Sequence, residues 1–150
     1  MIELWIDALT KIWQIDDGRG SLVKSYRLFE KNEIPDSLDT FPCAITYLVE
    51  VESNYSGGAS FDLITGVTEF HLAAGVAKSN MAYVMRFVDR IKTAAAANVT
   101  LGGLVSYFTL TPNQPNILGP LELYYGDNAP NMGLTAHWTV KTNDNVAVGG

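Results

Sequence analysis

Between residues 2 and 13, apolar side chains recur every three or four positions, which is the spacing that keeps them on one face of an α-helix. Charged residues take intervening positions, so the helix is predicted to be amphipathic. Two aspartates and two glycines within residues 16–20 then favour the end of the helix. The predicted apolar face consists of Ile2, Trp5, Leu9, Ile12 and Trp13.

Two later stretches alternate between apolar and polar residues, which is the period of a half-buried β-strand. They span residues 44–51 and 67–73, and we expect them to form a hairpin. Residues 21–29 fit a strand and a helix equally well. The first strand is predicted to present Ile45, Tyr47, Val49 and Val51 on one face, and the second to place Phe70 and Leu72 opposite Glu69 and His71.

The segment between these strands, Glu52–Gly66, is much longer than the roughly two to five residues of an ordinary hairpin loop. It contains glycine and serine, few charges, and the aromatic residues Tyr55 and Phe61. Aromatic side chains are enriched at protein interfaces. We therefore predict a long loop that becomes ordered on meeting a partner.

A second helix is predicted over residues 79–97, with Ser79 as its N-cap. Strands are predicted at 104–110, 121–125 and 132–140, and the tail 143–150 is expected to be flexible. The resulting order, α-β-β-α-β-β-β, favours one α+β domain over residues 1–150, with a mainly antiparallel or mixed five-stranded sheet packed by two helices. The second helix would bury Met81, Val84, Met85, Val88, Ile91 and Ala95.

Composition narrows the functional classes. The chain has 150 residues, of which 47% are hydrophobic and 17% charged, so its charge is below the roughly 25% of an average soluble domain. A formal net charge of -6 disfavours wrapping around nucleic acid, because neutralising phosphates requires clustered Lys and Arg. The single cysteine, Cys43, cannot form an internal disulfide, and neither a signal peptide nor a membrane span is predicted. We expect a protein that is assembled in the cytoplasm.

Candidate chemistry is sparse. Glu69 and His71 would project from the same side of a strand, so a metal pair with His137 would be the candidate metal site. We favour a solvated or interface pair instead, because both histidines are predicted to lie on polar strand faces. No serine occupies a Gly-x-Ser-x-Gly motif, and Cys43 follows Pro42 into a strand as a small core residue. We therefore predict no catalytic residue, no metal and no cofactor, and we do not expect an enzyme.

Two sets of surface residues are candidates for protein contacts. The second helix carries three cations close together in sequence, although the neighbouring Asp89 is also typical of a solvated face. An aromatic pair before a polar turn is of the type enriched at interfaces. The candidate docking patch is Arg86, Arg90 and Lys92, and the candidate interface is Tyr124, Tyr125, Asp127 and Asn128.

Taken together, these elements resemble the tail terminator (tail completion) proteins of long-tailed bacteriophages and prophages. The N-terminal helix leads through an irregular stretch to Phe41-Pro42 and the first strand, and an insertion-bearing hairpin follows. The next helix ends in Asn98-Val99-Thr100-Leu101-Gly102-Gly103 before a strand. Last comes Gly119-Pro120-Leu121-Glu122-Leu123-Tyr124-Tyr125-Gly126, followed by Gly133 and an alternating final strand. The match covers most of the chain through short motifs.

The resemblance implies a structural virion protein: a homo-oligomeric ring, expected to be a hexamer, at the head-proximal end of the phage tail. Such a ring caps the tail tube, stops its polymerisation and offers a docking face to a head-completion or connector protein. DNA would only pass through the lumen, and neither a cofactor nor a membrane is involved. In the family, the loop between the first two strands reaches toward the tube. The corresponding candidate contacts to the tube or a neighbouring subunit are Asn54, Tyr55, Phe61, Asp62 and Leu63.

Two alternatives stay open. Another head-tail connector or stopper subunit would share the size and the charge of this chain. A small α+β enzyme or ligand-binding domain belongs to a different class, and it predicts a deep polar cleft between the sheet and the second helix that uses Tyr107, His137 and Trp138.

Overall fold

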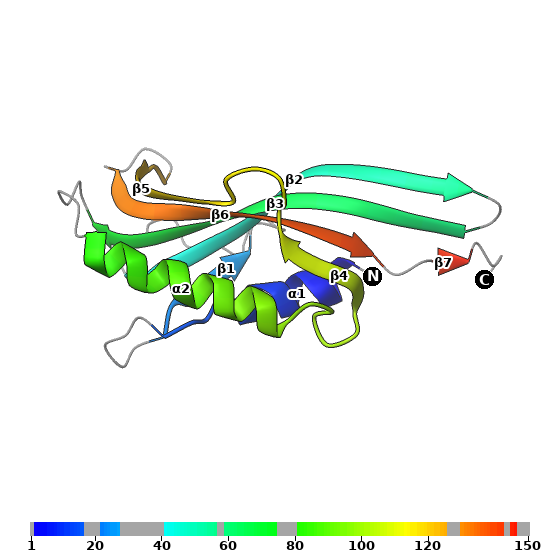
Figure 1. The fold of residues 1–150 in the computed structure, drawn as a ribbon, viewed down its shortest axis with the longest axis horizontal. Coiled ribbons are helices and arrows are strands. Elements are labelled where there is room, and N and C mark those ends of the chain that lie inside the picture. The colour runs from blue at the N-terminus through cyan, green and yellow to red at the C-terminus, as the bar shows by residue number, and fades with distance from the viewer. Residues whose placement is uncertain are drawn as a thin grey trace.

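The computed structural model describes residues 2–16, 22–27, 41–56, 59–74, 81–125, 130–142 and 145–146. Within these ranges the chain forms two helices and seven strands (Figure 1). The helices are α1 (Ile2–Ile12) and α2 (Met81–Ala97). The strands are β1 (Lys24–Arg27), β2 (Cys43–Ser56), β3 (Ala59–Ala74), β4 (Val105–Leu110), β5 (Ile117–Leu123), β6 (Asn131–Thr142) and β7 (Asn145–Val146).

The strands form one mixed sheet in the order β1-β2-β3-β6-β4. β1 runs parallel to β2, and the other pairings are antiparallel. β4 and β5 pair with the same edge of β6, one after the other along its length. The backbone of His137 in β6 forms hydrogen bonds with both ends of the loop that joins them. Its carbonyl accepts from the N–H of Thr111 at 2.9 Å, and its own N–H donates to the carbonyl of Asn116 at 2.7 Å. β7 continues the line of β6 along β3.

The predicted α+β class, with two helices and a mixed sheet, is confirmed, but the predicted number of strands is wrong. The ambiguous region 21–29 contributes β1, and part of the tail predicted to be flexible forms β7. Both strands are short, and they obtain their structure from a neighbouring strand rather than from an alternation of their own. The other tail residues, 143–144 and 147–150, lie outside the described residues.

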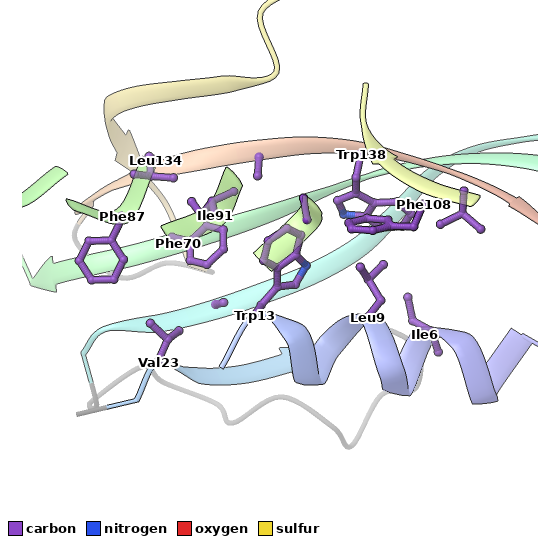
Figure 2. Close-up of a cluster of buried hydrophobic side chains, with 14 of the residues drawn as sticks. Ile6, Leu9, Trp13, Val23, Phe70, Phe87, Ile91, Phe108, Leu134 and Trp138 are labelled. Atoms are coloured by element: carbon purple, nitrogen blue, oxygen red, sulfur yellow. The ribbon is translucent and has the colours of Figure 1, made fainter. Parts of the chain in front are cut away.

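The core lies between the helices and one face of the sheet, and α1 confirms the prediction of an amphipathic helix. Trp13, just after α1, meets Phe70 of β3 edge-on with 5.6 Å between ring centroids, and Phe108 of β4 at 5.9 Å. Trp5 meets Trp138 of β6 edge-on at 6.3 Å. Each such pair adds roughly 0.5–1.5 kcal/mol beyond the burial of its area. Figure 2 shows how side chains from both helices converge on the sheet.

A series of hydrogen-bonded polar side chains lies inside this core. The indole N–H of Trp138 donates to Thr68 Oγ1 at 3.2 Å, and that hydroxyl also bonds to Thr46 Oγ1 at 2.9 Å. All three residues are buried. Buried polar groups are tolerated when they are hydrogen-bonded to one another. The hydrogen bonds among Trp138, Thr68 and Thr46 therefore link β6, β3 and β2 beneath the helices.

The predicted apolar stripe of α2 is partly wrong. Met81 and Met85 are 50% and 48% exposed, whereas Phe87, which was not in the stripe, is fully buried. The buried residues Val84, Phe87, Ile91 and Ala95 follow a 3-4-4 spacing, which rotates the buried face of the helix away from the two methionines. Residues 79–80, including the predicted N-cap, lie outside the described residues.

The predicted apolar face of the first strand is partly wrong: Ile45 and Tyr47 share a face and Ile45 is buried, but Val51 lies on the other face. The side of β2 that packs on the core carries Ala44 and Thr46, and Thr46 hydrogen-bonds to Thr68 there. Ile45 and Tyr47 point to the opposite side. A register shift between Leu48 and Glu50 then reverses the alternation.

Shifts of the same kind move other strand boundaries and faces. One in β4 allows both Val105 and Phe108 to be buried although they are three residues apart. β5 spans residues 117–123 rather than the predicted 121–125. β6 confirms the predicted last strand, with its apolar face of Leu134, Ala136, Trp138 and Val140 fully buried.

Candidate functional site

The most prominent surface feature is a long β-hairpin, which we call the arm: residues 49–56 of β2 and 59–64 of β3. Figure 1 shows the arm extending along the long axis of the molecule, past the helices. Its strands pair up to Ser56 and Ala59, which leaves two residues between them. The prediction of a long loop at 52–66 is therefore wrong, because backbone pairing continues through most of that segment. Val49, Val51 and Tyr55 on the arm are 61%, 53% and 70% exposed.

The sequence did contain a signal for the arm. Gly57-Gly58 stands between two runs with β-forming residues, and a two-glycine turn of this kind is typical of a tight hairpin. The register shift after Leu48 disrupts the alternation that would have extended the first strand to the turn.

All five predicted contact residues lie on the arm, but they are divided between its two faces. Asn54 is paired with Phe61, and Leu63 lies two residues further along the same face. Lys141 of β6 places its Nζ 4.5 Å from the centre of the Phe61 ring, a cation–π contact. Asp62 is on the other face with Tyr55, and its carboxylate accepts a hydrogen bond from Ser53 at 2.6 Å.

One edge of the arm has no strand partner in the described part of the chain. On the β3 side, β7 pairs with residues 59–60 and β6 pairs from Leu63 onward. On the β2 side, β1 pairs only with residues 43–46. Among the described residues, the β2 edge from Tyr47 to Ser56 thus has no strand partner, and unpaired edges of this kind favour pairing or docking.

The three cations of α2 do not form a single patch, so that prediction is corrected. At 100° per residue, Lys92 lies on the opposite flank of the exposed surface from Arg86 and Arg90. Arg90 borders an open groove of about 480 Å³ with Asp16 and Asp89, whereas Lys92 borders a different groove of about 410 Å³. Arg86 and Arg90 stay together, since the Arg90 guanidinium donates to the Arg86 carbonyl at 3.1 Å.

The predicted tyrosine interface is only partly described. Tyr124 follows β5, is 64% exposed, and donates its hydroxyl to a Glu122 carboxylate oxygen at 3.3 Å. Tyr125 is half-buried. Asp127 and Asn128 lie outside the described residues.

His71 does not lie on a polar strand face as predicted; it is fully buried. Its Nε2 lies 3.1 Å from Glu69 Oε1, and its Nδ1 lies 3.0 Å from the Asn131 amide nitrogen. The other Glu69 oxygen accepts from the Tyr47 hydroxyl at 2.9 Å. Because both ring nitrogens are engaged and no solvent reaches the ring, His71 is placed to hold β2, β3 and β6 together. Sequence reasoning anticipated the Glu69–His71 pair but not its partners Tyr47 and Asn131.

Two residues at or beside this hydrogen-bonded group, Tyr47 and Cys43, have raised pKa values. Burial, together with the hydrogen bond to Glu69 and the charge of that carboxylate, raises the pKa of Tyr47 to about 12. Burial raises the pKa of the Cys43 thiol to about 11, which disfavours the thiolate that a nucleophile requires. Cys43 is a free, fully buried residue, as the sequence predicted.

The structure does not bring the other candidate chemical groups together. His137 lies on the same sheet face as His71, but its β3 partner is Val67, four residues from His71. Among the described residues, no cluster of three or more His, Cys, Asp or Glu side chains could hold a metal ion. Trp138 is buried in the core on the opposite face from His137, and Tyr107 borders the groove next to Lys92. These three residues therefore do not line a common cleft.

Comparison with known proteins leaves the family of the chain open. Neither helix of the described chain has the length and apolarity needed to cross a membrane. A scan against models of protein families finds no match, and a search of curated protein sequences finds no similar protein.

Proposed function

We propose that this chain is a structural subunit of a ring that caps a phage tail tube, stops its polymerisation and provides a docking face for a head-completion protein. The observation that carries the proposal is the arm. The resemblance of the sequence to tail terminator proteins supplies the identity of the assembly.

The arm supports an assembly role because most of it extends past the helices (Figure 1) and its β2 edge has no strand partner in the described chain. On its other edge, it pairs with β6 from Leu63 onward and with β7 at residues 59–60. The arm nevertheless projects beyond both helices and exposes Val49, Val51 and Tyr55. Exposed apolar residues gathered on one projecting element are typical of a surface that a partner covers.

A ring places a simple demand on such a subunit. Each copy must offer two different surfaces that fit each other, so that the rotation between neighbours closes the circle. Figure 1 shows the arm extending past the helices, so the arm and the helical face of the sheet are separate surfaces, which suits a contact between unlike surfaces. In the proposed ring, the tip of the arm, with Tyr55 and Phe61, points toward the tail tube.

A capping assay tests the proposal. The purified chain is added at increasing ratios to the tail tube protein encoded in the same genome while that protein polymerises. Tube lengths are then measured by negative-stain electron microscopy. We expect the tubes to shorten as the ratio rises and a ring to be visible at one end. Unchanged tube length at a molar excess of a chain that forms rings would exclude tube capping and favour the head-tail connector alternative.

Matched variants locate the contact. Tyr55→Ser at the arm tip should raise the concentration needed for capping at least about tenfold, because exposed tyrosines are frequent interface anchors. Ring formation should persist in this variant. The control is Leu22→Ser, a side chain of similar exposure, 67% against 70% for Tyr55, located before β1. Equal capping by both variants would contradict a tube contact at the arm tip.

A further inference from the structure

The described chain leaves several charges without an opposite partner. Arg27 pairs with Asp7 at 2.6 Å, and Glu69 pairs with His71. By contrast, Glu50 and Glu52 on the arm form no ion pair within the described residues, although both are exposed. The same holds for Arg86 on α2. A surface carboxylate pair and a surface arginine pair thus lie on two separate elements.

Glu50 and Glu52 lie on the same face of the arm. They are paired with Thr65 and Leu63 of β3, and Val51 between them points to the other face. A strand rises about 3.3 Å per residue, so their Cα atoms are about 7 Å apart. The two carboxylates form a short acidic row near the base of the arm, whereas Tyr55 and Phe61 lie nearer the tip.

Arg86 and Arg90 are one helical turn apart, which places their side chains about 6 Å apart on the same flank of α2. The hydrogen bond from Arg90 to the Arg86 carbonyl keeps the second guanidinium beside the first. Asp89 is exposed on the neighbouring side of the helix, and it would repel a carboxylate row that was rotated toward it. The arginine pair therefore matches the acidic row in spacing and in charge, and Asp89 restricts its orientation.

We propose that Glu50 and Glu52 of one copy bind Arg86 and Arg90 of α2 in the next copy; this contact rests on the proposed ring function and identifies its subunit interface. Glu50 and Glu52 lie on the sheet face opposite Ile64, whereas α2 packs on the core on the side of Ile64, so the two pairs do not meet within one chain. Each copy would donate one acidic row and accept another, which makes the interface heterologous. Planar guanidinium groups bind carboxylates through two parallel hydrogen bonds, which also fixes the orientation of the neighbour.

Neutralising variants test the contact, with oligomeric state measured by sedimentation velocity at one protein concentration and ionic strength. Glu50→Gln/Glu52→Gln and Arg86→Gln/Arg90→Gln should each raise the apparent dissociation constant of the oligomer at least about tenfold. The glutamate variant changes the net charge by the same amount as its control, Glu122→Lys on β5. The arginine variant changes the net charge by the same amount as its control, Lys11→Glu on α1. Both controls should assemble within about twofold of the unmodified chain.

Charge reversal supplies a test that loss of folding cannot imitate. Glu50→Lys/Glu52→Lys and Arg86→Glu/Arg90→Glu should each be monomeric, with unchanged circular dichroism. Mixing the two should restore assembly, because the reversed arm of one variant meets the reversed helix of the other. A chain that combines all four reversals should also assemble. Failure of both restorations would overturn the proposed contact.

The outcomes separate this contact from the proposed function. If the unmodified chain forms rings and both neutralised variants assemble equally well, the interface lies elsewhere and the ring proposal stands. If the unmodified chain stays monomeric at every concentration and does not shorten tail tubes, both proposals are wrong. A reversal variant that loses its circular dichroism leaves the neutralised pair to decide, since glutamine introduces no repulsion.

Discussion

Replacing Thr68 with valine is expected to lower the free energy of unfolding by about 1 to 5 kcal/mol, although the side chain keeps nearly the same shape. The Thr68 hydroxyl accepts the indole N–H of Trp138 at 3.2 Å and bonds to Thr46 at 2.9 Å. Valine removes the partner of both groups where no water reaches them. A single oxygen atom therefore links three strands inside the core.

The magnitude follows from the two groups left unpaired. Each buried polar group without a partner costs roughly 1–3 kcal/mol, so the two together cost about 2 to 6 kcal/mol. Burying a methyl group in place of the hydroxyl returns about 0.8 kcal/mol or somewhat more. Thr46→Val alone removes only one bond from a Thr68 hydroxyl that still accepts from Trp138, and it should cost about 1 kcal/mol.

The combination gives the sharper test, because the sign of one change should reverse. In the Thr68→Val background the Thr46 hydroxyl has already lost its partner, so Thr46→Val should raise stability by about 1 kcal/mol. Urea unfolding followed by tryptophan fluorescence and circular dichroism measures all four proteins. Protein concentration must be held constant, since assembly would add to the apparent stability.

Thr65→Val provides the control. Thr65 lies on β3 three residues before Thr68, points to the other face of the sheet and is half-buried, and its hydroxyl has no partner in the described chain. Its replacement should change stability by less than about 0.5 kcal/mol. If Thr46→Val lowered stability by the same amount in both backgrounds, the proposed coupling through Thr68 would be refuted.

Three further changes probe the packing and the polar cluster. Gly66→Ala should lower the free energy of unfolding by about 2 kcal/mol or more in urea titrations, because a Cβ there would clash with the Trp138 ring and lie 2.6 Å from the Tyr47 carbonyl oxygen. An unchanged unfolding midpoint would contradict the packing. Cys43, whose pKa is raised to about 11, should react with a thiol reagent at pH 8 far more slowly in the folded chain than in urea, and equal rates would contradict its burial. The pKa of Tyr47 is raised from 10.0 to about 12, so the folded state holds this proton more tightly than the unfolded state, and stability should fall as pH rises from about 10 to about 12. Tyr47→Phe should remove that part of the fall, as measured by thermal unfolding at several pH values; an unchanged pH profile would show that Tyr47 is not its source.

Long periodic patterns were the most informative part of the sequence. The spacing of Trp5, Leu9 and Trp13 predicted α1 and its buried face, and alternation over 132–140 predicted β6 with Trp138 inside. Both elements bury nearly every apolar residue of one face, so the pattern and the packing carry the same information. Cys43 was likewise predicted to be buried.

The arm shows where that reasoning fails. A register shift after Leu48 interrupts the alternation, and the exposed residues beyond it have no core to impose a period. Pairing there is set by backbone hydrogen bonds to the opposite strand, and the order of apolar and polar side chains does not predict those bonds. The five candidate contact residues lie in one segment, but their division between two faces of a hairpin was not predictable from a loop.

The sequence by itself determined that this chain builds one α+β core from two helices and a sheet, because buried faces leave a period in the order of the residues. Only the tertiary structure decided what lies outside that period. It placed His71 in a buried network with Glu69 and Asn131, separated Lys92 from Arg86 and Arg90, and paired β7 with β3. Each of these outcomes depends on residues far apart in the chain, and their proximity arises from strand register and helix rotation rather than from local spacing.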